Sequence, residues 1–194
     1  MIIHELEGAT PLDPAELVGL KLKHVGARRE LDEVEQANII AGLLWLRAQR
    51  LTRVTDMALL VQLHKQLFGE VWSWAGSFRK TEKNIGVDPL QISQQLRNLL
   101  DDAVAWHRYQ TYPPRQALLR LHHGIVKIHP FANGNGRFAR IYTDWVADKL
   151  YGIAPIQWGN ADLQRTSAIR GAYIAALRAA DGNDFSPLCE LFEA

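Results

Sequence analysis

The sequence IHPFANGNGRFAR at residues 128–140 combines a histidine, a proline turn, two glycines around an asparagine, and two arginines three positions apart. Apolar residues at helical spacing precede and follow it, so the glycines lie in a loop that begins a helix. The first N–H groups of a helix have no intrahelical partner, and the helix dipole makes that end positive. The stretch therefore predicts an anion-binding site at a helix N-terminus.

The composition is that of one ordinary globular domain. The chain has 194 residues, which is enough for one well-filled core, and 47% of them are hydrophobic and 22% charged. The formal net charge is +1, so no polyanion is implied by charge alone. Any positive field is local, as at Arg137 and Arg140, and no direct nucleic-acid partner is expected.

The single cysteine and the N-terminal sequence indicate a cytoplasmic protein. Cys189 has no second cysteine in the chain to pair with, which favours a reducing compartment. The first residues carry acidic side chains where a signal peptide would be basic and then apolar. No run of about 20 apolar residues follows, so no membrane association is expected.

Two units are predicted along the chain. Residues 1–29 contain Thr10-Pro11, Asp13-Pro14 and Gly19, which interrupt any long periodicity, so an irregular segment packed on the rest is expected. Residues 30–194 form the domain itself. Its apolar spacing and its helix-start and helix-stop residues predict seven helices at about 30–50, 55–69, 88–107, 114–128, 136–150, 160–180 and 186–194.

Several helix ends can be named from the sequence. Thr55 and Asn160 are expected N-caps, Gly69 a stop, and Asp88-Pro89 a sharp start. The residue before Pro130 is pushed out of the α region, so the helix from 114 ends near 128. In the helix after the loop, we expect Ile141, Trp145 and Val146 to be buried.

Residues 70–87 differ from the rest of the chain in composition and in apolar spacing. They are rich in Trp, Gly and polar residues and show no 3.6-residue apolar stripe. Phe78, Thr81, Ile85 and Val87 favour strands, so a short β-hairpin that projects as a flap is predicted.

The loop resembles the signature of the Fic family, H-x-F-x-(D/E)-G-N-G-R-x-x-R, and seven of the eight specified positions match. The exception is Asn133, where the family usually has a carboxylate. The resemblance implies an all-α, Fic-type helical bundle with a small β-hairpin flap, which makes residues 30–194 the Fic domain. The N-G-N-G-R form is most similar to that of the mobile mystery protein B group.

The resemblance implies transfer of AMP from ATP to a Ser, Thr or Tyr hydroxyl of a target protein, with the toxin side of a bacterial regulatory pair as one expected role. A hydroxyl is a weak nucleophile at neutral pH, and His129 has a suitable intrinsic pKa for a general base. Gly134, Asn135 and Gly136 would bring backbone N–H groups to the phosphates. Arg137 and Arg140, one turn apart, would hold the outer phosphates.

Three further roles follow from the resemblance. Asn133 would take the place of the carboxylate that binds Mg²⁺, keeping an oxygen ligand without its charge. Lys80, Thr81, Glu82, Lys83 and Asn84 would form the part of the flap that aligns an extended target segment by main-chain pairing.

The third role is inhibition. Many family members have an inhibitory helix with the pattern (S/T)-x-x-x-E-(G/N), whose glutamate pairs with the second arginine. Residues 31–36 keep only the glutamate, Glu35, and residues 186–191 match in spacing but end with Leu191. Helix-surface charge is the other interpretation of both, and an antitoxin-like inhibitory partner is the alternative to an internal glutamate.

Competing interpretations stay open at this point. A histidine before proline is usually a turn residue, and the two arginines can cap acidic neighbours. His122 and His123 lack the spacing of a metal site, so helix packing is favoured. A phosphotransferase similar to Doc toxins is disfavoured because those have lysine where this chain has Gly136. A non-catalytic nucleotide-binding module, partnered with a DNA-binding protein, is the alternative from another class.

Overall fold

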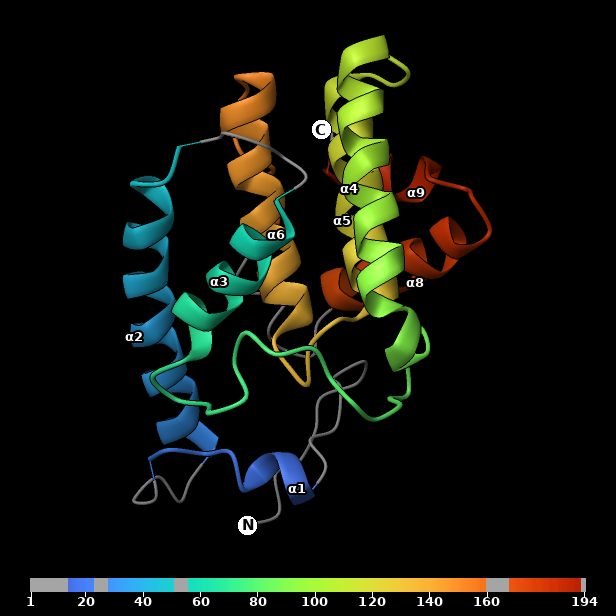
Figure 1. Cartoon of the computed structure of the whole chain (residues 1–194). Coiled ribbons are helices and arrows are strands. Elements are labelled where there is room, and N and C mark those ends of the chain that lie inside the picture. The colour runs from blue at the N-terminus through green and yellow to red at the C-terminus, as the bar shows by residue number, and fades with distance from the viewer. Residues whose placement is uncertain (1–13, 23–27, 51–55, 160–167, 193–194) are drawn as a thin grey trace.

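The fold is a bundle of helices in a computed structural model that describes residues 14–22, 28–50, 56–159 and 168–192 (Figure 1). Its elements are α1 (Pro14–Leu17), α2 (Arg28–Arg47), α3 (Met57–Phe68), η1 (Pro89–Gln91), α4 (Ile92–Tyr109), α5 (Pro114–Ile128), α6 (Asn135–Val146), η2 (Ala147–Tyr151), α8 (Ala168–Asp181) and α9 (Ser186–Phe192). Seven of the described helices have seven residues or more, in agreement with the predicted all-α bundle.

Helices α5 and α6 form the centre of the bundle. Helix α5 packs against α4, α6, α8 and α9, while α3 packs against α2 and α6. Figure 1 shows α2 and α3 on one side and α8 and α9 on the other. The loop between α5 and α6, residues 129–134, is the predicted anion-binding loop, so its position is fixed by the two most enclosed helices.

The core explains why these two helices are so well held. Leu118, Leu121 and Ile125 of α5 and Phe138 and Tyr142 of α6 are buried. Trp145 and Val146 are buried as predicted. Ile141 is only partly buried, because its face of α6 borders a cleft rather than a neighbouring helix.

Most predicted helix boundaries are confirmed. Helix α5 ends at Ile128, ahead of Pro130, and the Asp88 carboxylate accepts from the N–H of Leu90 at 2.8 Å to start η1. Asp56, not Thr55, caps α3, because its side chain accepts from the N–H groups of Ala58 and Leu59. Thr55 and Asn160 lie outside the described residues.

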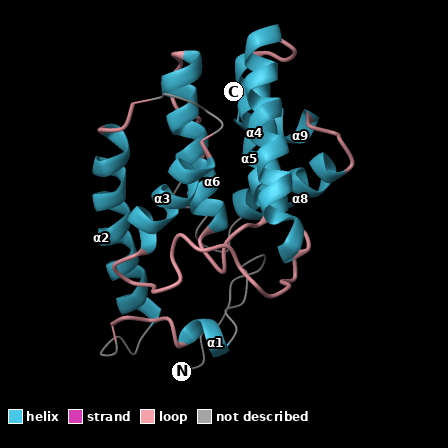
Figure 2. Cartoon of the chain, viewed as in Figure 1, coloured by secondary structure: helices cyan, strands magenta, loops and turns pink. Residues whose placement is uncertain are grey.

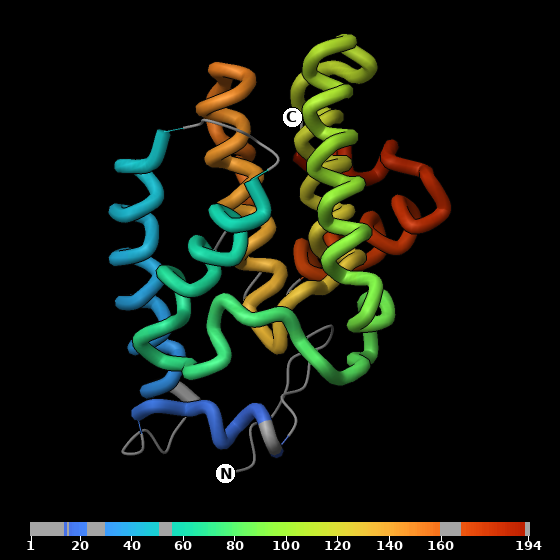
Figure 3. Tube along the Cα trace, viewed as in Figure 1, coloured from blue at the N-terminus to red at the C-terminus, as the bar shows by residue number. Residues whose placement is uncertain are grey.

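The predicted β-hairpin at residues 70–87 is wrong. Between residues 56 and 159 there is no strand, and Figures 2 and 3 show this segment as an irregular loop across one end of the bundle. Phe78 forms an isolated bridge with Phe131 instead of pairing within the segment. The Arg79 guanidinium accounts for the difference, since it binds the carbonyls of Thr81 and Val87 that a hairpin ladder would use.

The described part of the N-terminal segment packs against residues 69–74. The N–H of Lys21 donates to the Val71 carbonyl, the N–H of Ser73 donates to the Gly19 carbonyl, and both distances are 2.9 Å. The Trp74 indole donates to the Glu16 carbonyl at 3.0 Å. Residues 1–13 and 23–27 of the predicted irregular segment lie outside the described ranges. None of the described helices is long and apolar enough to cross a membrane.

Candidate active site

A loop with two left-handed residues links α5 to α6. His129 has φ 53° and ends α5, while Gly134 has φ 76° and precedes α6. The buried Asn135 amide spans the loop, accepting from the N–H of Phe131 at 2.9 Å and donating to the Phe131 carbonyl at 2.8 Å. The Asn135 side chain therefore stabilises the loop conformation.

His129 lies in an environment that keeps its imidazole neutral. The residue is 4% exposed, and its Nδ1 lies 3.3 Å from the Val126 carbonyl. A ring nitrogen facing a carbonyl must donate, so Nε2 carries the lone pair. The pKa of His129 is lowered to about 4, chiefly by burial and also by the charges of Arg79 and Lys83, while the hydrogen bond to the Val126 carbonyl raises it. A neutral imidazole with its lone pair on Nε2 is the form a general base needs.

Arg137 lies on the first turn of α6 and is paired with a glutamate. Its Nη1 donates to Glu35 Oε2 at 2.7 Å, and its guanidinium carbon lies 4.9 Å from the centre of the Phe68 ring. Glu35 Oε1 also accepts from the Trp72 indole at 2.6 Å. The pairing of Glu35 with the first arginine corrects the family expectation, in which the inhibitory glutamate meets the second.

Arg140 is held by a tyrosine on α8 instead. Burial lowers the pKa of Arg140 below its ordinary value, and the Tyr173 hydroxyl acts in the opposite direction. The Tyr173 hydroxyl lies 2.8 Å from His122 Nε2, while His123 Nε2 lies 3.0 Å from Asp181. The two neighbouring histidines therefore have separate partners, and His122 is part of the support of Arg140.

Asn133 and the two glycines shape the start of α6. The Asn133 side-chain oxygen accepts from the N–H of Gly134 at 2.7 Å, and its carbonyl lies 3.2 Å from His64 Nε2. A Cβ on Gly134 would lie 2.8 Å from Phe68 Cζ, so Gly134 is required by its φ and by space. A Cβ on Gly136 would meet only Arg140 Nη1, at 3.7 Å. A side chain at position 136 would therefore extend toward the Arg140 guanidinium.

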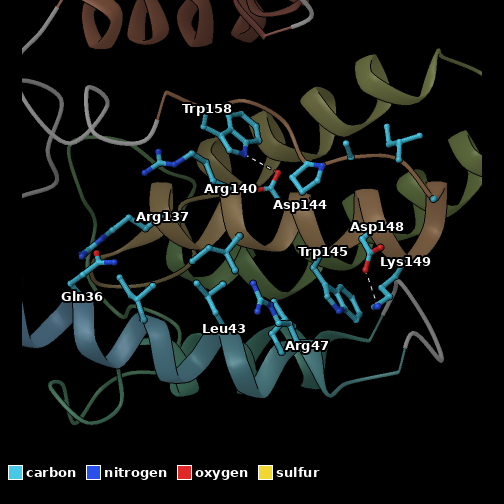
Figure 4. A pocket seen from close by; sticks show the side chains of 17 residues that line it. Gln36, Leu43, Arg47, Arg137, Arg140, Asp144, Trp145, Asp148, Lys149 and Trp158 are labelled. Carbon is cyan, nitrogen blue, oxygen red and sulfur yellow. Dashed lines mark hydrogen bonds and ion pairs between the residues drawn. The ribbon is translucent and has the colours of Figure 1, made fainter.

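A cleft of about 830 Å³ runs along α6 from these arginines. Figure 4 shows Gln36 of α2 near Arg137, Leu43 and Arg47 of α2 further along toward Trp145, and Arg140 on the other side of α6 beside Trp158. On another side of the cleft, Asp144 holds residues 156–158 in place. Its carboxylate accepts from the N–H of Ile156 at 3.1 Å and from the Trp158 indole at 2.9 Å. Both guanidinium groups line this cleft, whereas His129 does not.

The predicted docking residues 80–84 are only partly available. Lys80, Thr81, Glu82 and Asn84 are exposed. The Lys83 side chain is 3% exposed and its Nζ lies 2.5 Å from Glu16 Oε2, so it forms a buried ion pair with α1. The side chain of Lys83 therefore does not belong to a docking surface.

Sequence patterns gave no role to three residues that support the loop. Arg79 binds four backbone carbonyls, His64 links Gly76 to Asn133, and Tyr173 holds Arg140. His64 also stacks on Phe131 with ring centres 3.6 Å apart. Their partners are distant in sequence, so no local spacing signals them.

The buried histidines make the fold sensitive to acid. Burial lowers the pKa of His64 and His122 to about 3 and that of His129 to about 4, all from 6.5. Below pH 6.5 the unfolded chain binds protons that the folded chain does not. As the pH falls below 6.5, the free energy of unfolding should therefore decrease, by up to about 1.4 kcal/mol per pH unit for each histidine.

Asp144 acts in the opposite direction, because burial raises its pKa from 3.8 to about 6. One carboxyl group does not offset three histidines, so the free energy of unfolding should still decrease as the pH falls. Urea unfolding at a series of pH values between about 7 and 5 measures this slope. Stability that increases on acidification over that range would contradict the assigned burial.

The class of protein is defined by two features together. The fold is a helical bundle, and a histidine-containing loop leads into a helix that carries two arginines. Residues 54–147 match the model of the Fic/DOC family. These residues form a Fic domain. Its finer placement near the mobile mystery protein B group stays a prediction.

Known relatives agree with this family. The chain is 26% identical over 170 residues to protein adenylyltransferase fic-1 of Caenorhabditis elegans, covering 82% of this chain and 31% of that protein. The structure of AMPPNP-bound BepC from Bartonella tribocorum has a TM-score of 0.66, 17% identity, and coverage of 92% of this chain and 96% of BepC. A fic-1 fragment has a TM-score of 0.65, 22% identity, and coverage of 90% and 50%. These two structures show the fold, and this chain spans about a third of fic-1.

Proposed function

We propose that this Fic domain transfers AMP from ATP to a hydroxyl side chain of a target protein. The observation that carries the proposal is His129, a buried neutral histidine in the loop that leads into α6, the helix whose first turns carry Arg137 and Arg140. The relative fic-1 is named an adenylyltransferase, and BepC binds AMPPNP, which supports a nucleotide as the substrate here.

The chemistry assigned to the site is one displacement at phosphorus. The target hydroxyl gives its proton to His129 Nε2 as its oxygen bonds to the α-phosphorus. The bond from that phosphorus to the oxygen bridging the α- and β-phosphates breaks, and pyrophosphate leaves with the bonding electrons. His129 then returns the proton to solvent. The N–H groups at the start of α6 and the two guanidinium groups stabilise the phosphate charge.

Magnesium is the metal expected with ATP. The loop offers it one side-chain oxygen, that of Asn133, which also accepts from the N–H of Gly134. Because Mg²⁺ takes much of its coordination from phosphates and water, a single neutral ligand fits a weak site. The metal would neutralise phosphate charge there.

The exposed residues Lys80, Thr81, Glu82 and Asn84 are the proposed docking segment for the target. They lie in the loop that contacts the active-site loop through Phe78 and Phe131. An extended target segment can pair with main-chain groups of this loop without a preformed hairpin, which is the β-augmentation mode of recognition.

Glu35 is the proposed internal inhibitor. Its carboxylate holds Arg137 away from phosphate and adds negative charge where a triphosphate would bind. The toxin role, and an antitoxin-like partner that would act in its place, remain parts of the proposal that rest on the family resemblance.

Labelled ATP tests the proposed reaction. Incubation with lysate proteins and Mg²⁺ or Mn²⁺ should transfer label from the α-phosphate to protein and none from the γ-phosphate. Label from the γ-phosphate only would indicate a phosphotransferase similar to Doc. ATP binding without either transfer would indicate the non-catalytic module.

Replacing Asn133 with aspartate should raise transfer several-fold in the presence of Mg²⁺. Aspartate keeps the oxygen that accepts from Gly134, adds a charge for the metal, and lies at a helix N-terminus, where a negative charge is favourable. Transfer rate and ATP affinity, each measured with and without Mg²⁺, check this. An unchanged rate together with tight ATP binding would remove Asn133 from the metal site.

A further inference from the structure

The Arg79 guanidinium hydrogen-bonds several backbone carbonyls near the loop. The residue is 4% exposed. Its Nε donates to the His129 carbonyl at 2.6 Å and its Nη1 to the Thr81 carbonyl at 2.8 Å. Its Nη2 donates to the Val87 carbonyl and, at 3.4 Å, to that of Ile128. One guanidinium thus binds four backbone oxygens from two segments.

The two segments have different proposed roles. Ile128 is the last residue of α5, and His129, which follows it, is the proposed general base. Thr81 is one of the docking residues, and Val87 lies three positions beyond Asn84, the last of them. The main chain joins the same segments, because the N–H of Arg79 donates to the Pro130 carbonyl at 2.9 Å and that of Val87 to the Ile128 carbonyl at 3.3 Å.

Local energetics explain why an arginine is required at this point. The last carbonyls of a helix have no intrahelical partner, and a cation there also interacts favourably with the helix dipole. His129 has φ 53°, a conformation that a residue with a side chain adopts at a cost, so the contacts around its carbonyl must hold it. Lysine has no planar fork with which to reach several oxygens at once.

Gly86 permits the close approach of the two segments. Its φ is 118°, and a Cβ there would lie 2.5 Å from Arg79 Nη2 and 2.9 Å from His129 Cβ. The segment around Gly86 therefore lies directly against both the arginine and the base. The phosphate loop has its own support, since Asn135 spans it without Arg79.

We propose that Arg79 is a positioning residue that fixes the target-docking segment and the general base as one unit. This inference rests on the proposed function for its catalytic consequence. Its structural consequence is independent of activity: loss of the guanidinium should loosen residues 80–87 and 128–130 together, while the phosphate-binding start of α6 stays in place.

Arg79→Met and Arg79→Lys test the proposal, with Arg108→Met, an exposed position at the end of α4, as the matched control. In the full chain, Arg79→Met should lower kcat for target modification about 100-fold, because the base is displaced. It should also raise KM for the target while ATP affinity is retained. Arg79→Lys should recover part of kcat, and Arg108→Met should behave as wild type.

Amide hydrogen exchange supplies the second readout and covers a variant that folds poorly. Arg79→Met should accelerate exchange at residues 80–87 and 128–130 together, with α2 and α6 as protected as in wild type. Faster exchange in only one segment, equal loss of ATP affinity and kcat, or an unchanged kcat would overturn the proposal. If the wild type transfers no AMP, the proposed function fails, and exchange alone still decides whether Arg79 joins the two segments.

Discussion

A His129→Ala protein is expected to bind ATP like the wild type and to transfer AMP about 100- to 10,000-fold more slowly, the usual contribution of a general base. The imidazole is buried at the end of α5, apart from the arginines that line the cleft. Its removal therefore deletes proton acceptance without deleting phosphate contacts. Single-turnover transfer and equilibrium ATP binding separate the two effects.

The pH dependence of the wild type adds a sharper test of this role. With a pKa of about 4, His129 is unprotonated at neutral pH and becomes protonated only as pH falls through about 4. At saturating ATP and target concentrations far below KM, kcat/KM for the target should hence stay level on acidification through pH 6.5 and decline only near the lowered value, within the range where the protein stays folded. A decline centred near 6.5 would mean that the histidine is not buried as described, and unchanged transfer by His129→Ala would assign the base elsewhere.

Replacing Glu35 with glutamine should increase ATP affinity by about tenfold, equivalent to about 1.4 kcal/mol, and increase transfer with it. The amide removes the charge that binds Arg137 at 2.7 Å, yet its oxygen can still accept from the Trp72 indole. Arg137 is then available to phosphate, and a carboxylate no longer repels it. Because Glu35 is buried and Arg137 is 24% exposed, we expect a stability loss of about 1–2 kcal/mol.

Glu33→Gln is the matched control, since Glu33 is an exposed carboxylate on the same helix. It should leave ATP affinity and transfer as in wild type. If Glu35→Gln lowers stability but changes neither ATP affinity nor transfer, then the ion pair serves the fold and inhibition must come from a partner protein.

The helical fold could be predicted because its signals are local. Pro130 ends α5, Asp88 starts η1, and the apolar spacing of α4 and α5 gives each a buried face. The hairpin prediction failed for the opposite reason. Strand-favouring residues such as Phe78 and Val87 indicate an extended backbone, but Arg79 binds carbonyls 49 and 50 positions away, and such a contact leaves no pattern in the neighbouring sequence.

The site was predictable where a short motif carries the geometry. His129, Gly134, Asn135 and Gly136 lie in the loop and the first turn of α6, so their order in the sequence fixes their order in space. The partners of the two arginines were harder to predict from the sequence. Glu35 could be named, but its pairing with Arg137 depends on how α2 packs beside α6, and Tyr173 reaches Arg140 from a helix more than thirty positions later.

Transfer of α-phosphate label by the Glu35→Gln protein, with and without His129→Ala in the same chain, tests the proposed reaction most directly. We predict that Glu35→Gln labels target protein from the α-phosphate faster than wild type, and that Glu35→Gln with His129→Ala binds ATP but leaves the target unlabelled. Equal labelling by the two proteins, or label that comes only from the γ-phosphate, would contradict AMP transfer by this site.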